Sequence, residues 1–276
     1  MRTLIQRTIT GLFFTGITIG GIYASPYTFM ALFALVCVLC LREYLGIVLV
    51  KEAPQHSLRL VMGFVLGLAP LAISWWSVWP AEKPARLDIA ETALIVLIMV
   101  AFAIEMFSRA ERPIEAVAAL ALGMVYIGAP FALLNMIAFQ GGEYHPHLIF
   151  GLLLLTWMND TAAYVFGSLW GKRKLFPRIS PKKTWEGTLG GVFSTLLFSW
   201  ALAYWFPEWS AVDWLVLAAI VALFGSLGDL VESMLKRSYQ KKDSSGLLPG
   251  HGGLLDRFDS FIFMLPFAAA YLYWLT

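Results

Sequence analysis

Long apolar runs recur from one end of this sequence to the other, and they restrict its fold more than any other feature. Of its 276 residues, 59% are hydrophobic and only 14% are charged. A soluble domain of this length needs many more charged residues on its surface. A helix that crosses a bilayer about 30 Å thick needs about 20 predominantly apolar residues. The sequence therefore predicts an all-α, polytopic integral membrane protein.

The apolar runs predict about nine transmembrane helices in a single transmembrane domain, residues 1–276. The first two runs are short, so we expect either tilted partners or one re-entrant pair with a break at Pro26. Arg2 and Arg7 precede an apolar stretch as in a signal peptide, but the runs that follow favour a retained first span. The predicted spans are about 8–23, 27–41, 58–79, 88–107, 113–139, 148–170, 187–206, 212–231 and 258–275.

Basic residues in the loops predict the orientation, because Lys and Arg accumulate on the cytoplasmic side of membrane proteins. With the N-terminus inside, every Lys and Arg except Lys83 and Arg86 falls in a cytoplasmic segment. The two most basic segments precede the seventh and ninth predicted spans. We therefore expect a multi-pass protein of the inner (plasma) membrane, with catalytic elements at its cytoplasmic edge, residues 160–187 and 229–260.

Asp160 lies near the middle of the sixth predicted span, where a carboxylate is costly. Insertion of a charged side chain at the centre of a span costs about 2.5–3.5 kcal/mol. One interpretation is an aspartate that only joins packed helices. The other is a residue that lines a polar cavity, and acids at comparable places in other spans favour it.

Two pairs of acids, each three residues apart, predict a metal site. Asp229 and Glu232 share one face of the eighth predicted span, and Asp256 and Asp259 open the ninth. Glu232 can form an ordinary ion pair with Lys236, whereas Asp229 has no basic residue three or four positions later. Helix capping can explain one of the later two acids. The oxygen ligands of Asp229, Asp256 and Asp259 suit magnesium and leave room for a second cation.

Two further segments suit phosphate binding. Gly250, Gly252 and Gly253 allow the backbone to approach a ligand closely, although a plain flexible loop is the alternative. Ser180 followed by proline predicts a helix start, which places two lysines in a first turn where the helix dipole disfavours cations. A bound anion explains that placement, whereas contact with anionic lipid explains the earlier basic residues of the loop. Those two lysines are Lys182 and Lys183.

The stretch from Ser233 to Asp259 resembles the signature of the phosphatidate cytidylyltransferases, or CDP-diacylglycerol synthases. It reads SMLKRSYQKKDSSGLLPGHGGLLDRFD, and the segments SPKKTWEG and NDTAAYVFG are also similar to segments of that family. The resemblance implies that CTP and phosphatidate react to give CDP-diacylglycerol and pyrophosphate, for phospholipid synthesis. It also implies a magnesium requirement and a homodimeric membrane enzyme.

The residue pattern and the resemblance together define the candidate site. The predicted catalytic residues are Asp229, Asp256, Asp259, Lys236 and Arg237, and the three aspartates are also the predicted metal ligands. The predicted substrate-binding residues are Asp160, Ser180, Lys182, Lys183, Thr184, Glu186, Lys242, Asp243, His251, Gly252, Gly253 and Arg257.

Two other functional classes compete with this interpretation. An ion-coupled transporter could use intramembrane carboxylates such as Asp160 and Asp229 as an ion path, but the sequence shows no internal repeat. A CDP-alcohol phosphotransferase would perform related chemistry, but its characteristic spacing of aspartates and glycines is absent. The two cysteines, Cys37 and Cys40, lie in one apolar run and are predicted to pack rather than to bind metal.

Overall fold

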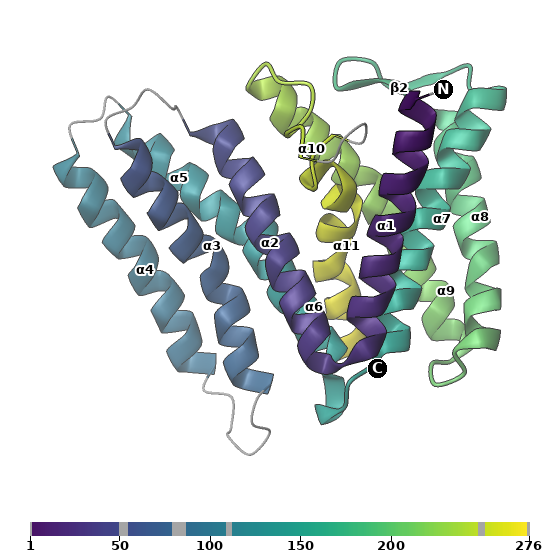
Figure 1. The fold of residues 1–276 in the computed structure, drawn as a ribbon, viewed down its shortest axis with the longest axis horizontal. Helices are drawn as coiled ribbons and strands as arrows, with labels where there is room; N and C mark the ends of the chain where they lie inside the picture. The colour runs from purple at the N-terminus through teal and green to yellow at the C-terminus, as the bar shows by residue number, and fades with distance from the viewer. Residues whose placement is uncertain (1, 50–54, 79–86, 109–111, 248–251, 275–276) are drawn as a thin grey trace. The chain divides into compact units, whose positions relative to one another are not determined.

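The structure is a computed structural model that describes residues 2–49, 55–78, 87–108, 112–247 and 252–274. These residues are mostly helical, in agreement with the predicted all-α class (Figure 1). The helices are α1 (Arg2–Ala24), α2 (Pro26–Val48), α3 (His56–Val78), α4 (Leu87–Phe107), α5 (Pro113–Gly123), α6 (Ala129–Ala138), α7 (Pro146–Trp170), α8 (Trp185–Trp205), α9 (Ala211–Ile220), α10 (Ser226–Ser238) and α11 (Leu255–Trp274).

Short π-helical segments join two pairs of helices into longer ones. The segment η1 (Met124–Gly128) connects α5 with α6, and η3 (Val221–Gly225) connects α9 with α10. A single 3₁₀ turn, η2 (Gln140–Gly142), follows α6. Each joined pair corresponds to one of the predicted apolar spans.

Six helices in the described part of the chain are long and apolar enough to cross a membrane. Two shorter apolar helices, Thr10–Ala24 and Thr92–Phe107, accompany them. The prediction of a polytopic membrane protein is confirmed, whereas the count of about nine spans is not confirmed. The six are Pro26–Val48, His56–Trp76, Pro113–Ala138, Pro146–Trp170, Trp185–Trp205 and Ala211–Ser238.

Helix α8 illustrates how apolar side chains face outward, as they do in a protein surrounded by lipid. Phe193 is 65% exposed and Trp200 is 72% exposed, and both follow the helical spacing of Leu189 and Leu197 on the same face. A soluble monomer rarely exposes a continuous apolar surface of this kind. The exposed stripe of α8 therefore agrees with a membrane setting.

The chain forms two compact units, which are described separately. The first comprises Met1–Tyr144 and Asp243–Leu255, and the second comprises His145–Lys242 and Asp256–Thr276. In the first unit, Tyr44 of α2 is fully buried and its hydroxyl donates a hydrogen bond to the carbonyl of Ala119 at 2.8 Å. This bond ties α2 to α5 inside the core of the first unit.

Small residues allow α7 and α8 of the second unit to pack closely side by side (Figure 1). A Cβ atom at Gly190 would overlap the Phe166 side chain, and one at Gly191 would lie 2.9 Å from Asn159 Oδ1. The close approach holds α7 firmly beside α8, and α7 is the helix that carries Asn159 and Asp160.

A two-stranded antiparallel hairpin precedes α8, and it is the one described departure from an all-helical fold. Its strands are β1 (Lys174–Phe176) and β2 (Ser180–Thr184), with Lys174 opposite Thr184 and Phe176 opposite Ser180. The prediction that a helix begins at Ser180 is therefore wrong. The cap of α8 is Thr184, whose hydroxyl oxygen accepts a hydrogen bond from the Gly187 N–H at 3.2 Å.

The physical reason for this correction lies in Glu186. Its carboxylate accepts the backbone N–H groups of Lys172 at 3.0 Å and Arg173 at 3.1 Å. The same carboxylate thus closes the base of the hairpin while occupying the first turn of α8, where negative charge is favourable. A proline at the second position of a short strand is compatible with this edge structure.

Candidate active site of charged residues in the second unit

Lys183 connects β2 with α10. Its Nζ lies 2.8 Å from Asp229 Oδ2 and donates a second hydrogen bond to the Ser226 carbonyl oxygen at 3.1 Å. Ser226 also accepts a hydrogen bond through its hydroxyl from Asn159 Nδ2 of α7, at 3.3 Å. Three separate elements, α7, β2 and α10, therefore meet around one lysine and one aspartate.

Three carboxylates from three helices interact electrostatically at this place. Asp160 of α7 interacts with Asp229 of α10, and Asp259 of α11 interacts with both. Lys183 and Arg257 supply the opposing positive charge. The structure thus brings Asp160, Asp229, Asp259, Lys183 and Arg257 into one charged cluster.

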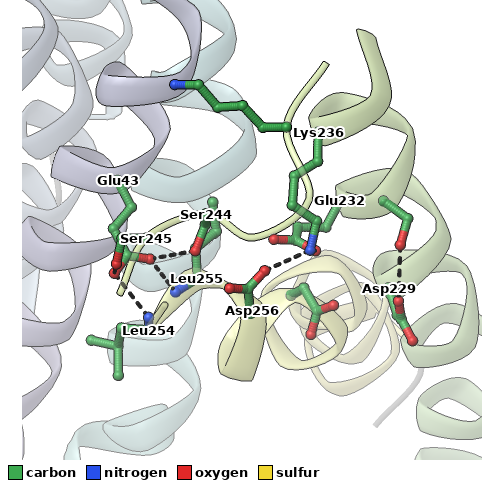
Figure 2. Close-up of polar contacts among 12 residues, drawn as sticks. Glu43, Asp229, Glu232, Lys236, Ser244, Ser245, Leu254, Leu255 and Asp256 are labelled. Atoms are coloured by element: carbon green, nitrogen blue, oxygen red, sulfur yellow. Dashed lines mark hydrogen bonds and ion pairs between the residues drawn. The ribbon is translucent and has the colours of Figure 1, made fainter. Parts of the chain in front are cut away.

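A second charged group connects α10 with the start of α11. Lys236 is buried and forms ion pairs with Glu232 on its own helix and with Asp256 Oδ1 at 2.5 Å (Figure 2). The predicted pair between Glu232 and Lys236 is confirmed. Glu232 is 1% exposed, and its Oε1 has no hydrogen-bond partner among the described residues.

Lys183 of the hairpin supplies Asp229 with a basic partner that its own helix lacks at the next turn. Asp256 likewise has Lys236. Sequence spacing along one helix cannot find such partners, since each comes from a different element. Lysines therefore neutralise the charges of Asp229 and Asp256 in this structure.

The donor set is compatible with magnesium, although the full three-aspartate site stays a prediction. Among the described residues, no group of three or more His, Cys, Asp or Glu side chains is arranged to hold a metal ion. Magnesium is commonly bound by one or two carboxylates together with water and substrate phosphates. Of the three predicted ligands, Asp259 of α11 interacts electrostatically with Asp229 of α10.

The remaining predicted residues lie at the edges of the second unit or outside it. Arg237 is exposed and donates to the Lys241 carbonyl at 3.3 Å. Ser180 and Thr184 lie at the two ends of β2, and Lys182 is exposed on that strand. Glu186 closes the hairpin. Lys242 lies in the exposed segment after α10. His251 lies outside the described residues.

Three predicted residues belong to the first unit, and they are close in sequence to the residues that bind Glu43, an acid that the sequence analysis missed. Gly252 has φ +83°, in the left-handed region that favours glycine. Gly253 is buried beside the carboxylate of Glu43, and Asp243 is exposed at the start of the same segment. Glu43 could have been suspected as a lone acid in an apolar run, because such residues are rare in membrane spans.

Comparisons with known proteins agree with the motifs. A family model described as "Cytidylyltransferase family" matches residues 5–275. A phosphatidate cytidylyltransferase of Staphylococcus aureus (strain COL) is 33% identical over 94% of this chain and 95% of its own length. The enzyme of the same name from Staphylococcus saprophyticus is 32% identical over 96% of both chains.

A third relative, from Staphylococcus epidermidis and also named phosphatidate cytidylyltransferase, is more similar over a shorter region. It is 44% identical over 147 residues, which are 52% of this chain and 55% of the relative. The comparisons confirm the resemblance inferred from the signature, and they give no support to the transporter alternative.

Proposed function

Because this chain belongs to the cytidylyltransferase family, we propose that it is the enzyme that transfers the cytidylyl group of CTP to phosphatidate. An oxygen of the lipid phosphate attacks the α-phosphorus of CTP. The bond from that phosphorus to the oxygen bridging to the β-phosphate breaks, so that CDP-diacylglycerol and pyrophosphate are formed. The observation that carries this proposal is the charged cluster around Lys183 and Asp229, on a chain whose signature and relatives point to the same chemistry.

The reaction needs electrostatics and positioning more than acid–base chemistry. A phosphate monoester is already an anion, so no strong base is required to create the nucleophile. Two anions must instead be brought together, and the leaving pyrophosphate must be stabilised. Lys183 is suited to bind a substrate phosphate, because its ammonium group donates to ionised oxygen. Lys236 holds Glu232 and Asp256 together and so orients the first turn of α11.

A magnesium ion would be held by aspartates of α10 and α11, with Asp229, Asp256 and Asp259 as the proposed ligands. When bound, the ion supplies positive charge to the phosphates of CTP and to the departing pyrophosphate. The protein's own contribution is to orient these carboxylates. Lys183 and Lys236 do this in the structure by pairing with Asp229 and Asp256.

The direct test uses purified protein with CTP labelled in the α-phosphate and with phosphatidate in detergent micelles. The proposal requires label in a CDP-lipid and release of one pyrophosphate for each labelled lipid. Omitting phosphatidate should leave the labelled CTP intact. If the protein hydrolyses CTP without forming a CDP-lipid, the proposed acceptor is wrong.

The enzyme is further proposed to be a homodimer of the inner membrane with its active site toward the cytoplasm, where CTP is soluble. The distribution of Lys and Arg supports this orientation, with the N-terminus inside and the C-terminus outside. Cysteine variants at Ser180 and Ser244, made without the buried Cys37 and Cys40, should react with an impermeant maleimide only in permeabilised cells.

A cysteine at Glu143 provides the matched control for this topology experiment. Glu143 is exposed and follows α6, on the side that the same orientation places outside. It should react in intact cells. If the cysteine at position 180 or 244 reacts in intact cells and the one at position 143 does not, the proposed orientation is wrong.

A further inference from the structure

Glu43 of α2 is a buried carboxylate with four hydrogen-bond donors, all from one distant segment (Figure 2). Its Oε1 accepts from the Ser245 hydroxyl at 2.5 Å and from the Leu254 N–H at 2.9 Å. Its Oε2 accepts from the Ser244 hydroxyl at 2.8 Å and from the Leu255 N–H at 2.8 Å. The side chain is only 6% exposed. Each oxygen thus binds one hydroxyl and one amide.

These contacts hold both ends of the glycine-rich segment. Ser244 and Ser245 begin it, and Leu254 and Leu255 end it, so a single carboxylate fixes the separation of the two ends. A buried carboxylate is costly unless its acceptor capacity is filled by donors. Here the donors that fill it belong to the two ends of the segment, so the placement of those ends and the burial of Glu43 depend on each other.

Gly253 supplies independent evidence that the segment is built around this carboxylate. A Cβ atom at position 253 would overlap both Ser244 Oγ and Glu43 Oε2. Glycine is therefore required here by close approach to Glu43, because any side chain would displace the carboxylate or the serine. In this chain, therefore, Gly253 of the signature-like stretch fits against a residue that lies outside that stretch.

Leu255 is the first residue of α11, and Asp256 follows it directly. The first N–H groups of a helix have no acceptor within the helix, and negative charge at that end is favourable. Glu43 accepts the N–H of Leu255 and the N–H of the residue before it. It therefore caps the helix that carries two of the proposed magnesium ligands.

We propose that Glu43 is a positioning residue for cytidylyl transfer: it fixes the residues on either side of the glycine-rich segment, and with them the first turn of α11 and the direction of the Asp256 carboxylate. This role rests on the proposed function. In this role Glu43 acts through the residues that it binds, Ser244, Ser245, Leu254 and Leu255, and not as a ligand of the metal. Residues that orient metal ligands or substrate-binding groups typically cost tenfold or more in activity when they are changed.

The test compares Glu43→Gln with wild type in two measurements. The amide keeps the shape but places an NH₂ group against donors, so one hydroxyl and one N–H lose their acceptor. We expect kcat/KM for CTP to fall by about tenfold. Hydrogen exchange of a peptide covering residues 252–258 should become faster, because the N–H of Leu254 or that of Leu255 loses its acceptor. Glu43→Asp should retain part of both properties.

Glu105→Gln is the matched control, since Glu105 is also a buried glutamate of the first unit. It is 1% exposed and binds Arg59 and Ser108 instead of the glycine-rich segment. This control should leave kcat/KM for CTP and exchange at 252–258 unchanged per folded molecule. Equal losses in Glu43→Gln and Glu105→Gln would reduce Glu43 to a general stability residue and overturn the proposal.

A second variant covers the case in which Glu43→Gln does not fold. The double change Ser244→Ala and Ser245→Ala removes both hydroxyl donors and leaves the carboxylate in place. It should change kinetics and exchange in the same direction, and wild-type values in both would overturn the proposal. The exchange measurement needs no substrate, so a wild-type protein that forms no CDP-lipid refutes the proposed function without affecting this test.

Discussion

Asp256→Asn should lower kcat by about a hundredfold to a thousandfold, the range typical for losing one preorganised electrostatic group in an active site. The substitution keeps the shape of the side chain and removes its charge. Lys236 then still pairs with Glu232, so the protein should still fold. The measurement is steady-state formation of CDP-lipid over a titration of magnesium, with thermal unfolding followed in parallel.

The magnesium titration separates two roles for Asp256. If it is a metal ligand, the magnesium concentration that gives half-maximal rate should rise. If it only holds Lys236, the maximal rate should fall at an unchanged magnesium requirement. Asp213→Asn is the control, because this aspartate of α9 binds Ser210 and Tyr271 instead of the charged cluster. Near-normal turnover of Asp256→Asn at low magnesium would contradict the proposed site.

Lys183→Gln should lower kcat/KM by about tenfold to a hundredfold. A charge-assisted contact between a lysine and a phosphate contributes about 1.5–3 kcal/mol, and each 1.36 kcal/mol is about tenfold in rate. The change also leaves Asp229 without its partner at 2.8 Å. Steady-state kinetics with both substrates varied should place the loss on the substrate whose phosphate Lys183 contacts, and Lys183→Arg should retain more activity than Lys183→Gln.

The neighbouring Lys182 is the matched control for this prediction. Successive side chains of a strand point to opposite sides, and Lys182 is exposed where Lys183 is half-buried. Lys182→Gln should therefore change kcat/KM little, and so should Lys172→Gln. Small, equal effects at positions 172, 182 and 183 would mean that this loop serves only as a membrane anchor.

Much of the architecture was predictable because a bilayer leaves few choices for an apolar chain. The runs of apolar residues predicted helices, and the signature predicted the family. Boundaries were harder: the second span was predicted to end at 41, yet α2 continues to Val48. That error assigned Glu43 to a loop, where an acid is ordinary, instead of to a buried helix, where it demands an explanation.

The charged partners could not be predicted, because they depend on contacts between elements that are far apart in sequence. Nothing beside Asp229 in its own helix indicates Lys183. Nothing at Ser180 and Pro181 indicates that Glu186 closes a hairpin through the N–H groups of Lys172 and Arg173. Local signals for a helix start were present, and a tertiary hydrogen-bond pattern overrode them.

The π-helical segment η3 has a consequence for how sequences of this family should be aligned. A π turn holds more residues than the 3.6 of an α-helix, and each added residue rotates the following helix by about 100°. Because η3 ends immediately before Ser226, the direction in which Asp229 points depends on the number of residues in 221–225. A one-residue deletion there would rotate the acidic face of α10 away from Lys183 without changing any charged residue. Chain length within this short stretch is therefore as much a determinant of the site as the identity of its aspartates.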